Sequence, residues 1–348
     1  MPSITSNITF LNDRPGDGVI IIQGPASPRI RIFSVGPGTT VTFAGLTLTN
    51  GSSAIAMDNA SVTVRNCYVT GHTSSAIVGN AFSSGIATLT VINSTFWNNS
   101  GGSGGAISLG TNTGGVVHAT VTNSTFDSNS ATSNFNPGSA INIVDNSNSA
   151  STLLLVNSTL AFNSSPSGGA TVSTDRATVQ TLNSIFVHSG SAGNFIVSGG
   201  SLVSLGHNLS DLPEGGDLGT GPGGFFNATG DKRNTNPQLG ALQSYGGLTL
   251  TRAVAAGTPP ADAGDDAVLS PPYSLTTDQR GAPRKSGAHI DIGAFEREVL
   301  PQSGPGFVVT TTADRDDGVC GAVDCTLRKQ SIWLTLTLMR IRSPLSPG

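Results

Sequence analysis

Apolar and polar positions alternate in short runs along most of the chain up to Gly190, and each run ends in a polar corner. In LTVIN the apolar side chains of Leu89 and Val91 alternate with polar Thr90, and Ala119 and Val121 do the same in HATVT. Alternation with a period of two predicts a strand that turns one face inward and one outward. The pattern therefore predicts many short strands joined by tight polar turns.

Two markers recur in step along these runs. The first is an asparagine that ends an alternating run, and it returns at intervals of 27, 30, 34 and 26 residues. The second is an alanine that follows a pair of small residues. Together the markers indicate an internal repeat. The asparagines are Asn66, Asn93, Asn123, Asn157 and Asn183, and the alanines are Ala54, Ala76, Ala106, Ala140 and Ala170.

Each repeat unit contains three candidate strands. In one unit these are GGAISLG, HATVT and STFDSNS, and three strands in so few residues fit one rung of a parallel β-helix. Because rungs stack at the strand spacing of about 4.8 Å, six rungs would form a rod on the order of 30 Å long. The sequence therefore predicts an all-β fold, a right-handed parallel β-helix with a loop-rich C-terminal cap.

The repeated asparagine suits the corner between the second and third strands. Such a corner needs the left-handed αL conformation, which Asn accepts better than any other residue except Gly. Stacked Asn side chains can also hydrogen-bond along the column as an amide ladder. We therefore predict that the five marker asparagines form a structural turn ladder. The apolar residue three positions after four of them is expected to point inward, namely Phe96, Phe126, Leu160 and Phe186.

The composition narrows the class of protein. Charged residues make up 11% of the chain and 45 residues are Gly, whereas charged residues are roughly a quarter of an average domain. Gly and β-branched residues disfavour helices. The net charge of −4 argues against a nucleic-acid partner, and no apolar run approaches the ~20 residues of a membrane span. We expect a monomer.

The sequence resembles a known family in several stretches. VTFAGLTLTNG (41–51) and the NSTF units resemble pectin-lyase-like right-handed β-helices of bacterial surface proteins, of the polymorphic outer-membrane-protein type. SLGHNLSD (204–211), the stretch 230–265 and TDQRGAPRKSGAHIDIGAFERE (277–298) resemble the choice-of-anchor Q domain. The resemblance implies a cell-surface or secreted bacterial protein, but it implies no activity.

These features divide the chain into three parts. We expect β-helix rungs over 1–198, a choice-of-anchor-Q-like module that caps the helix over 199–298, and a linker with an aborted next repeat over 299–348. MPSITSNITF lacks a signal peptide, so we expect a fragment of a longer repeat protein.

The C-terminal module carries a cluster of charged residues near its end. A solenoid needs a cap because its last rung otherwise exposes bare strand edges. We expect partly buried ion pairs that pin a final DIGAF strand, and the alternative is that the two arginines bind an anion or a sugar acid. The cluster comprises Asp278, Arg280, Arg284, Asp291 and Glu296.

The last segment resembles the beginning of another unit. FVVTTTADRDDGVCGAVDCTLR (307–328) matches the start of the family motif C-S/T-L-R-E-A-I, which breaks after Arg328. We expect residues 329–348 to be the frameshifted product of a longer tandem gene. Cys320 and Cys325 are close enough to bridge, and Cys67 is expected to be a buried free thiol. The aspartates between 314 and 317 lack the spacing of an EF-hand, so we expect no metal there.

An enzyme of this fold needs a group of carboxylates on one face. The rungs offer few, and the one pairing that the sequence suggests is Asp145 with Asp175, stacked on adjacent rungs. We interpret the histidines as solvated or turn residues. The carboxylates of the rungs are Asp58, Asp127, Asp145 and Asp175, the arginines are Arg65 and Arg176, and the histidines of the chain up to 207 are His72, His118, His188 and His207.

These observations favour a non-enzymatic surface module, adhesin-like or glycan-binding, with no cofactor, no metal and glycans or other surface components as partners. Long columns of Ser, Thr and Asn provide many weak hydrogen bonds for such a partner. Two alternatives stay open: a lyase or hydrolase acting on an acidic polysaccharide, and a passive spacer.

Overall fold

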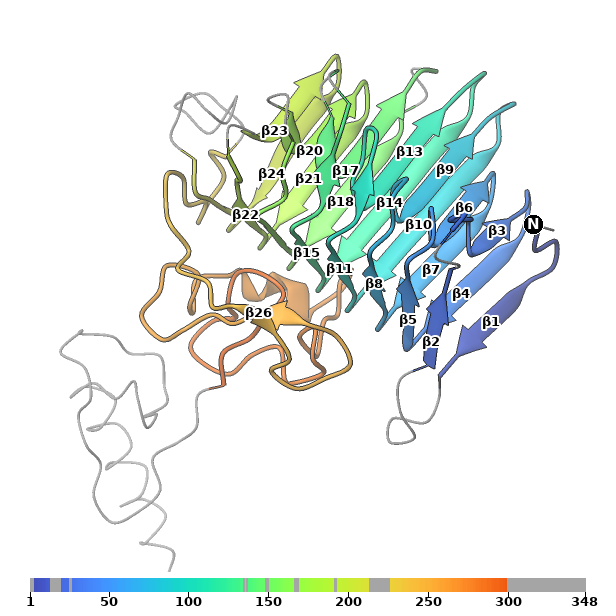
Figure 1. The fold of residues 1–348 in the computed structure, drawn as a ribbon. Helices are drawn as coiled ribbons and strands as arrows, with labels where there is room; N and C mark the ends of the chain where they lie inside the picture. The colour runs from blue at the N-terminus through green and yellow to red at the C-terminus, as the bar shows by residue number, and fades with distance from the viewer. Residues whose placement is uncertain are drawn as a thin grey trace, which may run out of the picture.

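The chain folds into stacked coils of short strands, as shown by a computed structural model (Figure 1). The structure describes residues 3–12, 20–24, 27–133, 135, 137–147, 150–165, 169–190, 193–212 and 226–298. Within these residues the one helical segment is the 3-10 helix η1 (Asp266–Leu269). The fold is therefore nearly all β.

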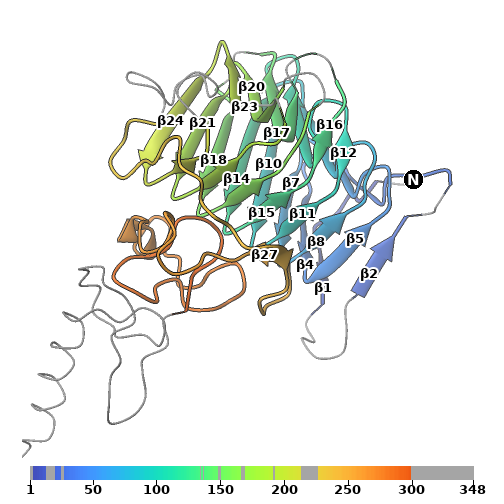
Figure 2. The same ribbon diagram turned by 60° about the vertical axis from the view of Figure 1, so that its left-hand side comes forward.

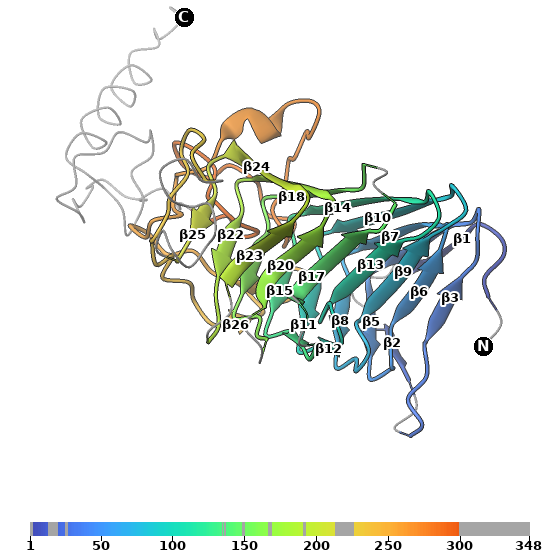
Figure 3. The ribbon, with the colours of Figure 1, turned by 90° about the horizontal axis from the view of Figure 1, so that it is seen from above.

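Three parallel sheets run along the molecule, and each coil contributes one strand to each sheet (Figure 3). We call them sheets A, B and C in the order in which a coil visits them. Sheet A contains β3 (Phe33–Val35), β6 (Ile55–Asp58), β9 (Ile77–Ala81), β13 (Ile107–Thr111), β17 (Gly138–Asp145), β20 (Ala170–Asp175) and β23 (Gly193–Ser198). Sheet B contains β1 (Ile8–Leu11), β4 (Thr40–Ala44), β7 (Ser61–Arg65), β10 (Ile86–Ile92), β14 (Val116–Thr122), β18 (Thr152–Val156), β21 (Thr178–Leu182) and β24 (Ser201–Gly206). Sheet C contains β2 (Ile20–Gln23), β5 (Leu46–Thr49), β8 (Tyr68–Thr70), β11 (Thr95–Trp97), β15 (Thr125–Asp127), β19 (Thr159–Ala161), β22 (Ile185–Val187) and β25 (Leu209–Ser210).

Equivalent residues of successive coils lie directly above one another. In sheet B, Ile92 pairs with Thr122 and Thr122 with Val156. In sheet C, Phe96 pairs with Phe126. This register confirms the parallel β-helix. Sheets B and C each contain eight strands, more than the six rungs expected from the markers, because coils at both ends of the tube lack one or both markers.

The core is the inside of this tube. The inward residues of all three sheets form one cluster of buried side chains that runs from Val35 to Phe226. The expected inward column of sheet C is present, and the rings of Phe96 and Phe126 stack with centroids 4.8 Å apart and planes 2° apart. Since every second residue of a strand contributes to this column, the alternation of the sequence is the main determinant of the fold.

An aromatic side chain, Phe226, is buried at the C-terminal end of the tube. β24 and β25 extend the sheets past residue 198, and Leu209 then forms a β-bridge with Lys232. Phe226 is buried there against Phe186 and Phe195, at centroid distances of 5.8 Å and 5.5 Å. An apolar plug of this kind shields the last coil from water.

The remainder of the C-terminal module lies along the side of the tube, not over its end. Figures 1 and 2 show residues 239–298 beside β11, β15 and β22 of sheet C. Apolar contacts join the two parts, because Ile292 packs with Ile185 and Leu209, and Ile290 packs with Leu182. The module also contains a short antiparallel pairing of its own, between β26 (Leu242–Gln243) and β27 (Thr251–Arg252). Residues 239–298 of the module that was expected to cap the helix thus pack against the side of the tube, along sheets B and C.

Candidate functional site

The five marker asparagines lie at the corner between sheets B and C. All have φ between 46° and 53°, the left-handed region. Their backbone N–H groups bond to the coil above, for example from Asn93 to the carbonyl of Thr122 at 3.1 Å and from Asn123 to that of Val156 at 3.0 Å. The corner therefore needs Asn for its backbone conformation.

The side chains of these asparagines contact the C-terminal module more than one another. Asn123 donates to the carbonyl of Thr277 at 2.8 Å, and Asn183 exchanges hydrogen bonds with the backbone of Asp265. One link joins two markers, from Asn183 to Asn157 at 3.4 Å. The amide ladder that we expected along this column is thus confined to one pair among the described residues, and the module binds the amides of Asn123 and Asn183.

A continuous amide ladder is present one turn later, inside the tube. It consists of the second asparagine of each NSTFxxN unit, six residues after the marker. The Nδ2 of Asn99 donates to Oδ1 of Asn129 at 2.9 Å, and Asn129 donates in the same way to Asn163 at 2.9 Å. All three side chains are buried. The second Asn of the repeat was the sequence feature that could have located this ladder.

His72 occupies the same position in the preceding coil. Its Nε2 lies 3.2 Å from the carbonyl of Leu48, just as Asn99 donates to the equivalent carbonyl of Val69 at 3.0 Å. The side chain is 1% exposed. Burial lowers the pKa of His72 to about 4, so the ring is neutral at pH 7. Our interpretation of His72 as a solvated or turn residue was therefore wrong, because this histidine replaces a ladder asparagine.

A third column follows the markers directly and consists mainly of serines. Each Ser hydroxyl donates to a carbonyl two residues earlier and accepts the backbone N–H of the coil below, as in the link from the N–H of Ser94 to Ser124 at 3.1 Å. Cys67 takes the serine position in its coil, and its N–H bonds to Ser94. Cys67 is a buried free thiol, as expected, and burial raises its pKa to about 11.

The charged cluster of the C-terminal module lies buried within it. Arg280 is bound to the carboxylate of Asp278 at 2.8 Å and to the carbonyl of Glu296 at 2.5 Å. Its guanidinium also covers the ring of Phe295 at 3.8 Å from the centroid. Asp278 accepts the N–H of Glu296 as well. The segment 291–295 forms no strand, and side-chain carboxylates hold it in place of a sheet.

A second buried group surrounds Arg284. Its Nη2 donates to the carbonyl of Asp291 at 2.6 Å and lies 3.5 Å from the carboxylate of Glu296. Burial raises the pKa of Glu296 to about 8 and that of Asp291 to about 6, and it lowers the pKa of Arg284. Arg280 and Arg284 are 7% and 0% exposed at their side chains. The alternative of a sugar-acid site at these arginines requires accessible side chains, which this geometry does not provide.

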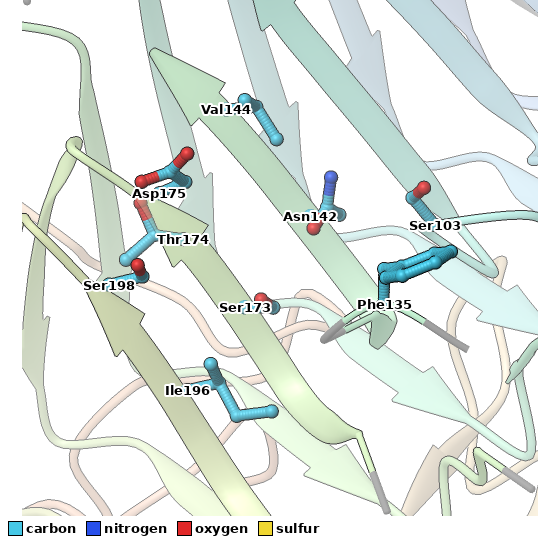
Figure 4. A pocket seen from close by; sticks show the side chains of 9 residues that line it. All are labelled: Ser103, Phe135, Asn142, Val144, Ser173, Thr174, Asp175, Ile196 and Ser198. Atoms are coloured by element: carbon cyan, nitrogen blue, oxygen red, sulfur yellow. The ribbon is translucent and has the colours of Figure 1, made fainter. Parts of the chain in front are cut away.

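A hollow of about 280 Å³ lies on the outer face of sheet A, over β17, β20 and β23 (Figure 4). Phe135 forms one wall from the segment between β16 (Ser130–Ala131) and β17, and its side chain is 89% exposed. Ser103 approaches from the segment between β12 (Ser100–Gly101) and β13. The other lining residues are Asn142, Val144, Ser173, Thr174, Asp175, Ile196 and Ser198.

The strand register explains why these residues share one face. Asn142 pairs with Ser173, and Ser173 pairs with Ile196, so the three form one outward column. Val144, Asp175 and Ser198 form the next outward column. The floor is therefore a small grid of amide, hydroxyl, carboxylate and aliphatic groups beside an exposed aromatic ring. Hydrogen-bonding groups on a rigid sheet next to one apolar surface suit a polyhydroxylated ligand.

The hollow contains one carboxylate among its lining residues. Asp175 is 39% exposed and binds Arg176 at 3.2 Å. Asp145 does not stack on it, because Asp175 pairs with Val144 after a bulge between Gly138 and Ile141. Asp145 is instead 0% exposed and accepts hydrogen bonds from Thr111 and the turn that follows β17. The expected stacking of Asp145 and Asp175 was wrong.

The other candidate residues come from different sheets and coils. Asp58 is exposed on sheet A, and Asp127 on sheet C is buried under Arg252 of the module. His118 is exposed, His207 has φ of 52° in a turn, and His188 pairs with Asp211 at 2.9 Å. Over the described ranges no three His, Cys, Asp or Glu side chains form a group that could bind a metal.

A long apolar helix capable of crossing a bilayer is not found in the described part of the chain. The expectations for Cys320, Cys325, the aspartates near 314 and the frameshifted tail lie outside the described residues.

The comparisons with known proteins give no relative. No family model matches this sequence, and no curated protein or solved structure shows significant similarity to it.

Proposed function

We propose that this chain is a non-enzymatic glycan-binding module, and that the hollow on sheet A is its binding site. The observation that carries the proposal is the exposed ring of Phe135 beside a floor of Asn142, Ser173 and Asp175. A ring that is 89% exposed offers a flat apolar surface on which a partner can pack. A sugar ring fits, because its C–H face packs on an aromatic ring while its hydroxyls reach polar groups.

The polar groups of the floor supply both kinds of hydrogen-bonding partner that a hydroxyl needs. The amide of Asn142 donates and accepts, the hydroxyls of Ser173 and Ser198 do both, and the carboxylate of Asp175 accepts. Arg176 neutralises Asp175, so the hollow favours neutral over strongly charged ligands. One such site binds weakly, and stacked modules in a longer protein increase the overall affinity through multivalency.

The sequence resemblance supports the setting of this function. A pectin-lyase-like β-helix of the polymorphic outer-membrane-protein type, with a choice-of-anchor-Q-like module over 199–298, belongs on the bacterial surface or outside the cell. The parallel coils fit such a helix. We propose that the chain is an adhesin-like part of a longer repeat protein. The competing functions are a passive spacer and an enzyme acting on an acidic polysaccharide.

A glycan array with three forms of the protein separates these possibilities. The wild type is expected to bind a subset of neutral glycans, and Phe135→Ser is expected to lose that binding. Leu248→Ser serves as the matched control, because Leu248 is also an exposed apolar residue, at 58%, but belongs to the C-terminal module. An array without any wild-type binding would favour the spacer.

The enzyme alternative has its own readout. Release of unsaturated or reducing sugar from acidic polysaccharides is followed with the same preparations. We expect no release above the rate of the Asp175→Asn variant, and a release that depends on Asp175 would overturn the non-enzymatic proposal.

A further inference from the structure

A second hollow lies on the opposite side of the tube, between sheet C and the start of the C-terminal module. Its volume is about 540 Å³. One wall comes from β19 and β22 and the residues after them, and the other comes from residues 236–239. Phe162, Val187 and Leu239 provide apolar surface, whereas His188 and Asp211 provide polar groups. None of these residues belongs to the site on sheet A.

Phe162 adopts a backbone conformation that does not suit a bulky side chain. Its φ is 56°, in the left-handed region. The equivalent positions of the two preceding coils contain Asn98 and Ser128, with φ of 53° in both. Small polar residues tolerate this region far better than Phe. The ring is nevertheless 41% exposed, so its burial in the core does not compensate for the strain. Strained positions of this kind occur mainly at functional sites.

The two polar side chains of the hollow, His188 and Asp211, hold each other in a defined orientation. Asp211 accepts the backbone N–H of His188 at 3.1 Å and binds the ring Nδ1 at 2.9 Å. Because a carboxylate accepts hydrogen bonds, the neutral imidazole of His188 carries its proton on Nδ1. Its Nε2 then has a free lone pair and acts as a hydrogen-bond acceptor. No described residue is bonded to Nε2. The imidazole, which is 35% exposed at its side chain, thus offers an acceptor to a ligand hydroxyl in the hollow.

The charges around the ring are already balanced. Arg252 lies over the ring of Phe162 at 4.4 Å from its centroid, and its guanidinium also bonds to Asp127 and to the carbonyl of Gly240. Neither charge of that ion pair is left for a ligand. The carboxylate of Asp211 would repel an anionic ligand. A cationic ligand would have to compete with His188 for that carboxylate, the one that lines the hollow. The hollow therefore fits an uncharged ligand.

We infer that this hollow is a second binding site and that it takes one ring of a neutral saccharide. The uncovered part of the Phe162 ring, together with Val187 and Leu239, packs on the C–H face of the sugar. Nε2 of His188 accepts a hydrogen bond from one hydroxyl. The site is independent of the sheet A hollow, so it stands or fails separately from the proposed function.

The ring protons of histidine report directly on this site in an NMR titration of the full chain. The chain has five histidines, and a His188→Gln variant identifies the signal of His188. The probes are methyl β-glucoside, methyl β-galactoside, N-acetylglucosamine and galacturonate. We expect at least one neutral probe to shift the His188 signal, with a dissociation constant on the order of 1 mM, and galacturonate to shift it less.

Phe162→Asn is the decisive variant, because it installs the residue that Asn98 provides in its own coil. We expect an unchanged or higher melting temperature together with at least a tenfold loss of affinity. Phe135→Ser is expected to leave the His188 titration unchanged. The inference is overturned if no neutral probe moves the signal, if galacturonate alone does so, or if Phe162→Asn binds as tightly as the wild type.

Discussion

The side-chain amide of Asn99 donates to that of Asn129 at 2.9 Å, and the backbone N–H of Asn99 reaches the same oxygen at 3.1 Å. Asn129 in turn donates to the carbonyl of Phe96 and to Asn163, both at 2.9 Å. One buried side chain therefore satisfies polar groups of three successive coils. Since buried polar groups are costly when unpaired, this ladder ties the coils together in one register.

Asn129→Ala tests the ladder. The substitution removes the acceptor that the side-chain amide and the backbone N–H of Asn99 share, and it removes a donor to the carbonyl of Phe96. We expect a loss of about 3 kcal/mol in the free energy of unfolding, measured by urea denaturation. Asn80→Ala removes an exposed asparagine and is expected to change stability by less than about 0.5 kcal/mol. Similar values for the two variants would show that the ladder is not stabilising.

His72→Asn tests whether the histidine is a substitute ladder residue. The folded protein holds the pKa of His72 at about 4, below that of an unfolded histidine at about 6.5. Protons therefore bind the unfolded state first as the pH falls. The stability present above pH 6.5 is lost progressively between about pH 6.5 and pH 4, by a total of about 3 kcal/mol. The Asn variant is expected to lose this dependence.

The measurement is the melting temperature between pH 4 and pH 7. His118→Asn is the control, because His118 is exposed and bonds only to Thr152 in the described structure, and its profile should follow that of the wild type. If His72→Asn retains the full acid sensitivity of the wild type, the burial of His72 is not its cause.

The corner column is tested by two substitutions at Asn93. Both Asn93→Ala and Asn93→Gly remove the amide, but only Ala keeps a Cβ that disfavours the φ of 49°. We expect the Gly variant to be more stable than the Ala variant by about 1 kcal/mol, as measured by chemical denaturation. The usual order, with Ala above Gly, would contradict a conformational role for the marker.

Gln279 tests the attachment of the C-terminal module. This residue is 2% exposed, and its amide donates to Thr95 and Thr249 and accepts from Thr125. Gln279→Leu removes the hydrogen bonds that join the module to Thr95 and Thr125 of sheet C. We expect hydrogen exchange over residues 239–298 to accelerate at least tenfold, while β10 and β14 stay protected. Gln243→Leu, at an exposed position, is expected to have no effect. Equal acceleration in both parts would indicate one cooperative unit.

The architecture could be predicted from the sequence because its cause is local and repeated. Alternation along LTVIN and HATVT decides which side chains point inward, and the αL corner restricts the choice at Asn93 and its equivalents. The same reasoning placed Phe96 and Phe126 in one stack. Repetition makes the prediction of strands and corners reliable, because the same alternation and the same corner residue recur in successive coils.

The position of the module and the composition of the site could not be read in this way. Ile290, Ile292 and Gln279 contact sheets B and C through pairings between residues that lie far apart in the sequence, for which no local pattern exists. The hollow on sheet A depends on a bulge that moves Asp175 from a position opposite Ile143 to one opposite Val144, and a bulge changes the register without a clear trace in the sequence. The second Asn of each unit is the sequence signal of the inner ladder. We interpreted only the first Asn, because its αL conformation at the corner explained why it recurs.

A crystal structure of the protein with a neutral oligosaccharide selected on the array would test the central claim most directly. The account predicts a sugar ring against Phe135, with hydroxyls bonded to Asn142 and to Asp175 in the hollow over β17 and β20. Clear density for the sugar on another face, with the sheet A hollow free of sugar, would contradict it.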